Sequence, residues 1–427
     1  MDKLIKIPYG DGEKSFKIDE KKLLYNIMPS LPPRPTAEEE EAKVRGALDN
    51  PIGTERIEDF VKSGDRVALL VDDWTRPTPA FKVAPLVLEE LSGAGIKDED
   101  VKVIIARGTH APLNRGQLEA KLGRRIIERF RVQNHEPGEN LMHLGASRKG
   151  TPVWINRAVM EADIKIAIGG ICTHPIAGYG GGAKIIVPGV AGIETINRNH
   201  SLADDPKAAI GVADGNPIRE DMEDIARMAG LDFVVNVILN PQKEVIEVVA
   251  GDVIKAHRTG VEIYNQIYGV RVGKEADIVV LGASPRDATL YHGTFALPCA
   301  VSMVKEKGTI IWVAPCLTGP GSKEERQRFR RTLSIPPDEL MRSIKESALK
   351  GRTPPSGGVF DWCTSRVVHR NKVVLISDLI SGQEAREWGF DHGDSIQRAL
   401  DEAIKVAGGD AKVTVIPVGG LTVPIIA

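Results

Sequence analysis

A glycine-rich stretch between two histidines contains the residues best suited to chemistry. Lys184 follows three consecutive glycines and lies ten positions after His174 and sixteen positions before His200. The glycines are Gly180, Gly181 and Gly182. Without side chains, such a loop lets its backbone approach a ligand closely. The stretch is not a Walker A motif, because an isoleucine follows the lysine. It indicates a covalently attached or metal-containing cofactor, or else a glycine-rich surface loop beside unrelated histidines.

Three further polar motifs follow short apolar segments that we expect to be strands, at residues 66–71, 101–106 and 164–168. The motifs are Asp72-Asp73-Trp74-Thr75-Arg76, Arg107-Gly108-Thr109-His110 and Thr173-His174. Amphipathic helices are expected between these strands, which predicts parallel βαβ units. Because ligands bind beyond the carboxyl ends of the strands in such sheets, the three motifs should gather at one edge.

The side chains in these motifs suit acid–base chemistry on a carboxylate. Imidazole titrates near neutral pH, so His110 and His174 could serve as general base and general acid if they face one crevice. The Arg76 guanidinium could hold a carboxylate with two hydrogen bonds, or instead cap a helix or pair with Asp72. Asp73 could accept hydrogen bonds from ribose hydroxyls or orient a histidine. Each histidine alone could also be structural.

The pattern of expected elements predicts an α/β fold with two α/β domains, mostly parallel sheets and an active-site cleft between the domains. We expect an N-terminal cofactor-binding domain at residues 1–273, rejoined by about residues 410–427, and a C-terminal α/β domain at residues 274–409. In the second domain, the segment 294–305 is expected to be a helix before a strand at 309–313.

Composition excludes several classes of protein. The formal charge of −2 gives no electrostatic reason to expect nucleic acid or a membrane surface as a partner. Four separated cysteines without a C-x-x-C pair fit a reduced protein and offer no zinc ribbon. The first residues lack an apolar signal core, and no uncharged apolar run approaches the ~18 residues needed to span a bilayer. These features predict a cytoplasmic location. The G-x-S-x-G, H-E-x-x-H and G-x-G-x-x-G signatures are absent.

Taken together, D-W-T-R-P, R-G-T-H, T-H-P…G-G-G-A-K and R-N-H resemble, in this order, the nickel-pincer lactate racemase family. The resemblance covers essentially the whole chain. It implies a nickel-pincer nucleotide, a pyridinium-3,5-bisthiocarboxylic acid mononucleotide carrying nickel, tethered to Lys184, with His200 as the protein ligand of nickel. It also implies acid–base roles for His110 and His174. The other implied contacts are Arg76 with the substrate carboxylate, Asp73 and Thr75 with the nucleotide, Gly181 and Gly182 beside it, and Trp362 and Tyr291 near the site.

The chain departs from this family beside the tyrosine. Where lactate racemases carry Y-Q-S-x-K, the sequence has Tyr291-His292-Gly293-Thr294-Phe295. A cationic substrate contact is lost, and an imidazole and an aromatic ring take the place of an amide and an ammonium. His292 and Phe295 are therefore expected to bind a substrate other than lactate.

The sequence thus predicts a racemase or 2-epimerase of a 2-hydroxy acid, working by proton-coupled hydride transfer to the tethered nucleotide. Its expected partners are a small 2-hydroxy acid and cofactor-synthesis proteins. Two alternatives remain open. One is a metallohydrolase in which His110, His174 and His200 bind zinc directly. The other is a non-catalytic cofactor carrier or sensor that kept the tether and lost lactate recognition.

Overall fold

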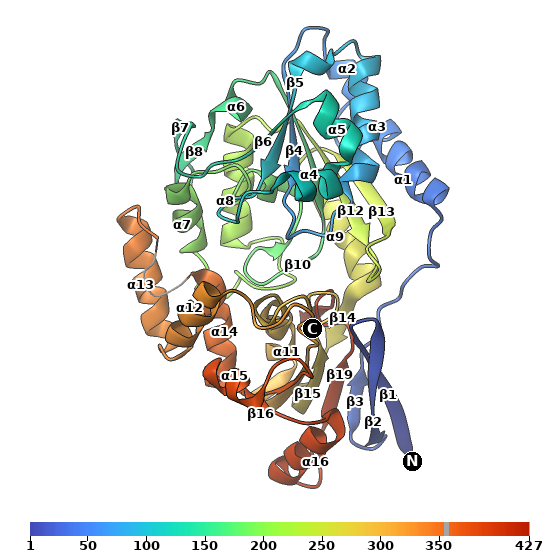
Figure 1. Cartoon of the computed structure of the whole chain (residues 1–427), viewed down its shortest axis with the longest axis vertical. Coiled ribbons are helices and arrows are strands. Elements are labelled where there is room, and N and C mark those ends of the chain that lie inside the picture. The colour runs from blue at the N-terminus through green and yellow to red at the C-terminus, as the bar shows by residue number, and fades with distance from the viewer. Residues whose placement is uncertain (354–357, 427) are drawn as a thin grey trace.

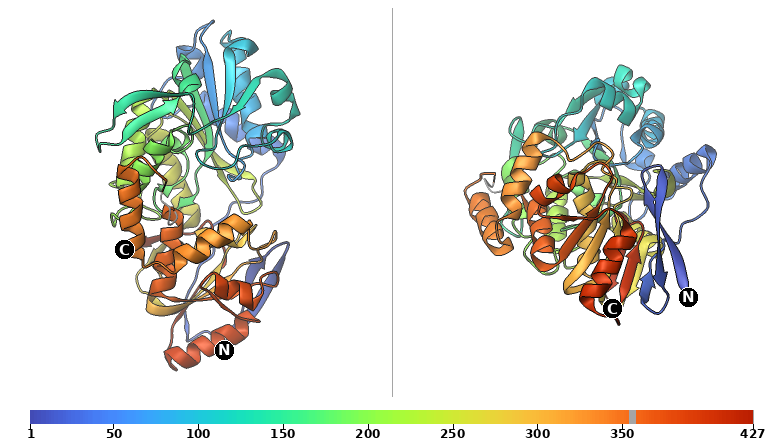
Figure 2. Two further views of the ribbon diagram at one scale, coloured as in Figure 1. Left: turned by 60° about the vertical axis from the view of Figure 1, so that its left-hand side comes forward. Right: turned by 60° about the horizontal axis from the view of Figure 1, so that its bottom comes forward.

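The chain forms two α/β domains, each built on a six-stranded sheet. The structure is a computed structural model and describes residues 1–353 and 358–426. One sheet occupies the upper part of the molecule in Figure 1 and the other occupies the lower part, and the left view in Figure 2 also shows the two bodies one above the other. The α/β class with mostly parallel sheets is confirmed.

The first sheet has the order β13-β12-β9-β4-β5-β6. All neighbours are parallel except β12 and β13, which are antiparallel. The strands are β4 (Val67–Asp72), β5 (Val101–Ala106), β6 (Arg131–Asn134), β9 (Ile164–Gly170), β12 (Phe233–Leu239) and β13 (Val245–Gly251). Because β9, β4 and β5 are parallel neighbours, their carboxyl ends lie at the same edge.

The second sheet has the order β18-β17-β16-β15-β19-β3, and all its neighbours are parallel. The strands are β3 (Leu23–Asn26), β15 (Ala276–Gly282), β16 (Val304–Val313), β17 (Lys372–Ile376), β18 (Asp391–His392) and β19 (Val413–Ile416). Four two-stranded pairs accompany the large sheets. They are β1 (Asp2–Tyr9) with β2 (Gly12–Asp19), β7 (Leu141–Ala146) with β8 (Pro152–Asn156), β10 (Thr173–His174) with β11 (Gly178–Tyr179), and β14 (Gly269–Val272) with β20 (Val423–Ile426).

Helices cover both faces of each sheet, because alternate residues of a strand point to opposite faces. In β4, Leu69 packs with the helices from α1 to α5, whereas Leu70 packs with the helices on the other face, α8 among them. The helices of the first domain are α1 (Ala37–Asp49), α2 (Ile57–Phe60), α3 (Ala80–Gly93), α4 (Arg115–Leu122), α5 (Arg124–Arg129), α6 (Arg157–Met160), α7 (Ile193–His200), α8 (Pro217–Met228) and α9 (Lys255–Tyr268).

The helices of the second domain follow the same principle. They are α10 (Leu290–Gly293), α11 (Leu297–Val301), α12 (Lys323–Leu333), α13 (Pro337–Leu349), α14 (Val359–Arg370), α15 (Gly382–Glu387) and α16 (Ile396–Ala407). Short 3-10 turns lie at η1 (Asp98–Asp100), η2 (Gly182–Ile185) and η3 (Thr294–Ala296). Among the described residues, none of the helices combines the length and the apolar character needed to cross a bilayer.

The N-terminal hairpin lies with the second domain, whereas we expected residues 1–273 to form the first. Its apolar face, Ile5, Ile7, Phe16 and Ile18, packs on the second sheet together with α16. The edge strand β3 then pairs with β19. At the other end of the chain, β19 belongs to the second sheet, while Val418 to Val423 pack against α9 of the first domain. The return expected at residues 410–427 therefore begins only after Ile416.

The helix expected at residues 294–305 is interrupted. A 3-10 turn at η3 leads into the short α11, which has Pro298 in its first turn, and β16 already begins at Val304. Proline has no N–H to continue a preceding helix, but it is well tolerated at the start of a new one. Val304 pairs with Ala276, so this segment is drawn into the sheet.

His135, at the end of β6, makes the free energy of unfolding depend on pH. It is fully buried, its Nε2 contacts the Ala191 carbonyl at 2.9 Å, and Asn156 Nδ2 lies 3.0 Å from its Nδ1. Burial lowers the pKa of His135 to about 4. An unfolded histidine titrates near 6.5, so the unfolded chain takes up this proton first as the pH falls. The contribution to stability is complete above about 6.5 and is lost as the pH falls toward 4.

We therefore expect the histidine to account for about 2 kcal/mol of the fall in the free energy of unfolding between pH 7 and pH 5. Urea unfolding at both pH values should show a smaller fall for His135→Gln than for the unchanged protein. His143→Gln is the matched control, since His143 is exposed. An equal fall in both variants would show that His135 does not titrate in this way.

Candidate active site

A cavity lies at the edge where β4, β5 and β9 end. In Figure 1 this is the lower edge of the first sheet. Six of the polar residues that line it come from three of the expected motifs: Asp72, Asp73, Arg76, Arg107, His110 and Lys184. The Thr173-His174 motif does not contribute to this lining. Glycines of the loop form another part of its wall: Gly180, Gly181 and Gly182. The fold therefore brings together residues that lie more than one hundred positions apart in the sequence.

Asp73 orients His110. The Asp73 side chain is 3% exposed, and its Oδ2 is in hydrogen-bond contact with His110 Nδ1. Burial by itself would raise the pKa of Asp73, but the hydrogen bond and charge of His110, helped by Arg76, hold this pKa below its ordinary value. An ionised carboxylate can only accept, so the proton lies on Nδ1 of the imidazole. His110 Nε2 is left with a lone pair, as a general base requires.

Thr75 contributes to this arrangement. Its backbone N–H and its hydroxyl both donate to Asp73 Oδ1, at 2.7 and 2.6 Å. The neighbouring Asp72 is held separately, because Lys121 Nζ lies 2.6 Å from its Oδ1 and the Thr78 hydroxyl donates to its Oδ2 at 2.6 Å. The two carboxylates thus have different partners, and only that of Asp73 contacts a histidine.

His174 contacts Lys184 directly. His174 Nε2 lies 3.1 Å from Lys184 Nζ, and the Ala177 N–H donates to His174 Nδ1 at 3.1 Å. Burial lowers the pKa of His174 and that of Lys184 well below their ordinary values. The charge of Arg76 lowers both pKa values further. A neutral imidazole that accepts at Nδ1 carries its proton on Nε2. The Lys184 amine therefore accepts this hydrogen bond through its lone pair, which only the neutral, nucleophilic form of the amine possesses.

His200, at the end of α7, has an unpartnered nitrogen. Its Nε2 is buried and makes no hydrogen bond within the described part of the chain. Burial lowers the pKa of His200 to about 3. The imidazole is therefore neutral at physiological pH. A buried, unpaired imidazole nitrogen is costly unless a ligand or metal satisfies it.

The glycine-rich loop is held from beneath by side chains that the sequence did not single out. Arg219 is fully buried and its Nη1 donates to the Gly181 carbonyl at 3.0 Å, while other nitrogens of its guanidinium contact the carbonyls of Ala177 and Tyr179. Asn236 Oδ1 accepts the Gly182 N–H at 2.7 Å. This N–H is therefore used within the protein, and the loop is rigid rather than an open cradle.

The glycines at the loop centre are required by its backbone. Gly181 and Gly182 have φ values of +72° and +57°, which side chains disfavour. A Cβ on Gly181 would also lie 2.6 Å from Asn236 Oδ1. Both features explain the glycines without a ligand, although both residues do line the cavity.

An aromatic wall from the second domain faces the histidines. The Phe360 ring, at the start of α14, stands edge-on to His174 and to His200, with centroid separations of 5.5 and 6.2 Å. Phe295 packs edge-on against Phe360 at 5.2 Å. The ring centroids of His292 and Phe295 are 6.3 Å apart. Burial lowers the pKa of His292.

Tyr291 and Trp362 have other neighbours in the second domain. Tyr291 packs between Phe295 and Phe329 within the second domain. The indole of Trp362 is 5% exposed and lines a different cavity. The aromatic ring beside the histidines belongs instead to Phe360, two positions earlier on α14.

Direct metal binding by the protein alone finds no support in this arrangement. Within residues 1–353 and 358–426, the structure contains no group of three or more His, Cys, Asp or Glu side chains placed to hold a metal ion. The three histidines have separate surroundings instead: Asp73 for His110, Lys184 for His174, and the end of α7 for His200.

Comparison with known proteins places the chain in a family. The model of the lactate racemase N-terminal domain matches residues 9–211, and that of the lactate racemase C-terminal domain matches residues 272–425. The chain belongs to the lactate racemase family. A lactate racemase from Thermoanaerobacterium thermosaccharolyticum is 30% identical over 424 residues, 97% of each chain. A lactate racemase from Lactiplantibacillus plantarum is 29% identical over 423 residues, 97% of this chain and 98% of that one.

Solved structures agree with this assignment to the lactate racemase family. The lactate racemase apoprotein from Thermoanaerobacterium thermosaccharolyticum superposes with a TM-score of 0.88 at 28% identity, over 100% of both chains. A protein from Thermotoga maritima shares the fold, with a TM-score of 0.65 at 19% identity over 92% of this chain and 98% of that one. The two-domain architecture is therefore that of lactate racemase, and the protein is an isomerase of the racemase type.

Proposed function

We propose that this protein is a racemase or 2-epimerase of a 2-hydroxy acid other than lactate, and that it uses a nickel-pincer nucleotide tethered to Lys184. The observation that carries the proposal is that the site contains two imidazoles, His110 and His174, which carry their protons on different ring nitrogens. His110 presents a lone pair through its contact with Asp73, whereas His174 presents an N–H toward Lys184. A reaction that removes the hydroxyl proton of one enantiomer on one side of the substrate and returns a proton to the oxygen on the other side needs a base and an acid in this relation.

The residues present fit the nucleotide. The neutral Lys184 amine is suited to acyl attachment, and the unpartnered His200 Nε2 offers a neutral imidazole nitrogen, a suitable ligand for nickel. Asp73 and Thr75 bind each other and His110, so in this proposal they orient the base rather than contact the ribose. When bound, the nucleotide supplies a carbon that accepts a hydride from C2 of the substrate and returns it.

The protein's own side chains bind the substrate and move its hydroxyl proton. Arg76 lies in the cavity with His110, so its guanidinium can hold the substrate carboxylate with two hydrogen bonds. His110 Nε2 takes the hydroxyl proton of one enantiomer, and Asp73 stabilises the imidazolium that forms. Phe360 and Phe295 cover the histidines and keep water away from the planar 2-keto acid while it turns.

His174 needs one adjustment before it can transfer a proton through Nε2. A neutral imidazole that gives up its Nε2 proton must carry another on Nδ1, and the Ala177 N–H now occupies that position. This contact must lengthen during turnover. Acylation of Lys184 removes the lone pair that accepts the Nε2 proton, so attachment of the cofactor releases His174 from its present partner.

The test is conversion of single enantiomers of 2-hydroxy acids carrying deuterium at C2. Protein made together with cofactor-synthesis enzymes should convert one enantiomer of an accepted acid into both, measured by chiral chromatography. The product should keep its deuterium in ordinary water, because a hydride is moved rather than a proton. Loss of deuterium to solvent would contradict hydride transfer, and no interconversion across the panel would contradict the racemase proposal.

The substrate preference is a second expected result. His292 and Phe295 form part of the aromatic wall. Neither supplies the ammonium of the lysine that lactate racemases carry at the position of Phe295. An aromatic ring can pack on a longer or flat substrate but does not compensate for desolvating a small polar acid. We expect better turnover of an aromatic or long-chain 2-hydroxy acid than of lactate, measured as kcat/KM.

The matched variant carries His292→Gln and Phe295→Lys together. It should raise the kcat/KM for lactate relative to that for the bulkier acid by about tenfold or more, since ~1.4 kcal/mol corresponds to a factor of ten. His369→Gln, at an exposed position, serves as the control and should leave the ratio of the two kcat/KM values unchanged. If the unchanged protein already prefers lactate over every larger acid, His292 and Phe295 do not select a bulkier substrate.

A further inference from the structure

A second cavity lies between the domains, beyond His174. Its volume is about 390 Å³, and it shares no lining residue with the cavity that holds Asp73 and Lys184. Three parts of the chain surround it: residues 175–176 and 208–210 of the first domain, the connecting residues 272–275, and helices α11 and α14 of the second. Pro175, which follows His174 directly, is part of its wall. The cavity thus has contributions from both domains.

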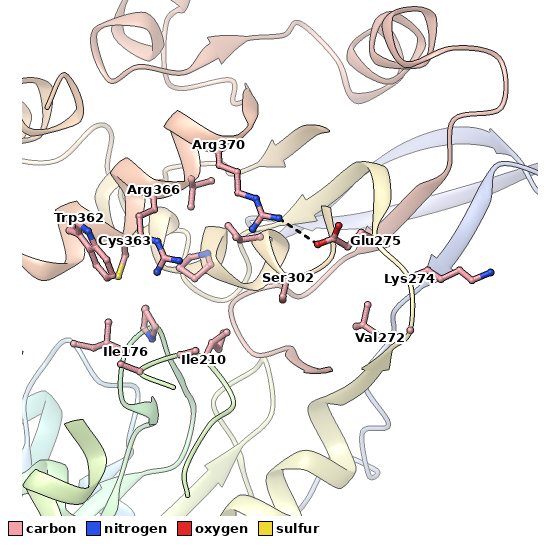
Figure 3. A pocket seen from close by; sticks show the side chains of 17 residues that line it. Ile176, Ile210, Val272, Lys274, Glu275, Ser302, Trp362, Cys363, Arg366 and Arg370 are labelled. Atoms are coloured by element: carbon pink, nitrogen blue, oxygen red, sulfur yellow. Dashed lines mark hydrogen bonds and ion pairs between the residues drawn. The ribbon is translucent and has the colours of Figure 1, made fainter. Parts of the chain in front are cut away.

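The cavity has an apolar interior. Ile176, Val272 and Val367 line it and are at most 5% exposed, and the indole of Trp362 lies at one end. Figure 3 shows Ile176 and Ile210 on the side of the first domain, opposite α14. The volume falls within the range of ~300–1,000 Å³ typical of small-molecule sites. The body of a ligand that fits here is therefore apolar.

The charge of the wall is positive. Trp362, Arg366 and Arg370 are four residues apart on α14 and share one face of the helix. The Arg366 guanidinium lies over the Trp362 ring, 4.8 Å from its centroid, and Arg370 Nη2 is 3.5 Å from Glu275 Oε1. In Figure 3 both guanidinium groups extend toward the cavity, whereas the Lys274 amine points away from it. Two guanidinium groups therefore face one carboxylate.

We propose that this cavity binds a small organic monoanion that has one carboxylate and an apolar body. Arg366 pairs with the carboxylate, since Arg370 is already engaged by Glu275, and the apolar body lies against Trp362, Ile176 and Ile210. Because the walls come from both domains, the ligand stabilises the domain arrangement described here over any more open one. The site is separate from the proposed substrate and nucleotide positions and does not depend on the reaction.

Binding is tested by calorimetric titration of the full-length protein without cofactor, with benzoate as the probe. We expect saturable binding of one benzoate per chain. Benzamide, which lacks the charge, and inorganic phosphate, which lacks the apolar body, should bind at least about tenfold more weakly. Benzoate should also raise the midpoint temperature of unfolding, because it binds only the folded protein.

The variants identify where benzoate binds. Arg366→Gln should weaken binding at least about tenfold, whereas Arg330→Gln, at an exposed position on α12, should leave it unchanged. Ser302→Phe places a ring in the cavity and should abolish binding, with circular dichroism to check the fold. Arg76→Ala removes the proposed substrate contact and should not affect binding. No saturable binding, or binding that depends on Arg76 and not on Arg366, would overturn the proposal, and neither result bears on the racemase reaction.

Discussion

Lys184→Ala is expected to lose both the covalent cofactor and all measurable racemisation while it keeps its fold. The Lys184 amine is the proposed point of attachment, and it is held neutral by burial beside His174. The side chain contributes one hydrogen bond and little apolar contact, so the midpoint of unfolding should change little. Intact-mass measurement of protein made with cofactor-synthesis enzymes should show the adduct in the unchanged protein and not in the variant.

Two controls make the result specific to the amine. Lys184→Arg keeps a cation in the cavity but no acylable amine, and should also lack the adduct. Lys207→Ala, at an exposed lysine nearby in the sequence, should keep both adduct and activity. An adduct or turnover in Lys184→Ala would rule out the tether. The same measurement separates the alternatives, since a zinc hydrolase carries no adduct and a cofactor carrier has the adduct without turnover.

His110→Ala and His174→Ala should each lower kcat by at least about a hundredfold, the usual size of a lost general acid or base. Both should still carry the cofactor, because neither supplies the amine or the unpaired nitrogen. His200→Ala should differ in kind: the nickel content, measured by elemental analysis, should fall first, and the activity should follow it. The comparison therefore requires metal content, adduct mass and kcat for each variant.

His369→Ala is the control for this series, because His369 lies exposed near the far end of α14 and contacts the Ser365 carbonyl. It should change none of the three measurements. If His110→Ala, His174→Ala and His200→Ala all lost metal to the same extent, the three histidines would act as metal ligands together. That outcome would favour the metallohydrolase alternative over the racemase.

Local patterns predicted most of the regular elements of this fold. The segment 101–106 is a run of apolar residues, and it forms β5 at those bounds. Thr36 and Glu39 form a capping box at the start of α1, a pattern that lies within four residues of sequence. Such elements depend on neighbours in the sequence, so their signal is contained in a short window.

Long-range pairing was the part that the sequence did not reveal. Nothing local in Leu23–Asn26 says that it pairs with a strand almost four hundred residues away. The same holds for the helix α14, which was not among the elements expected from the sequence. Its first turn is buried by residues of both domains, and that burial is decided by tertiary contacts.

The site was predictable where strands carry their side chains to a common edge. Asp73 and His110 meet because β4 and β5 are parallel neighbours and both motifs follow their carboxyl ends. Phe360 and Arg219 were missed for opposite reasons. Phe360 reaches the histidines from the other domain, and Arg219 lies in an ordinary amphipathic helix where an arginine is normally exposed.

The position of β3 has a consequence for how the protein is made. Leu23 pairs with Val413, so a strand near the beginning of the chain stays without its neighbour until about 390 further residues have left the ribosome. The hairpin β1–β2 meanwhile exposes an apolar face that only β15 to β17, β19 and α16 can cover. All six strands of the first sheet can therefore form during synthesis, although Val418 to Val423 cover α9 only at the end, while the second sheet is completed only after Ile416 emerges. A protein fragment of residues 274–427 alone would lack the edge strand β3 and the hairpin that covers one face of the sheet. A soluble version of that domain would need residues 1–27, supplied as a separate peptide or by fusion.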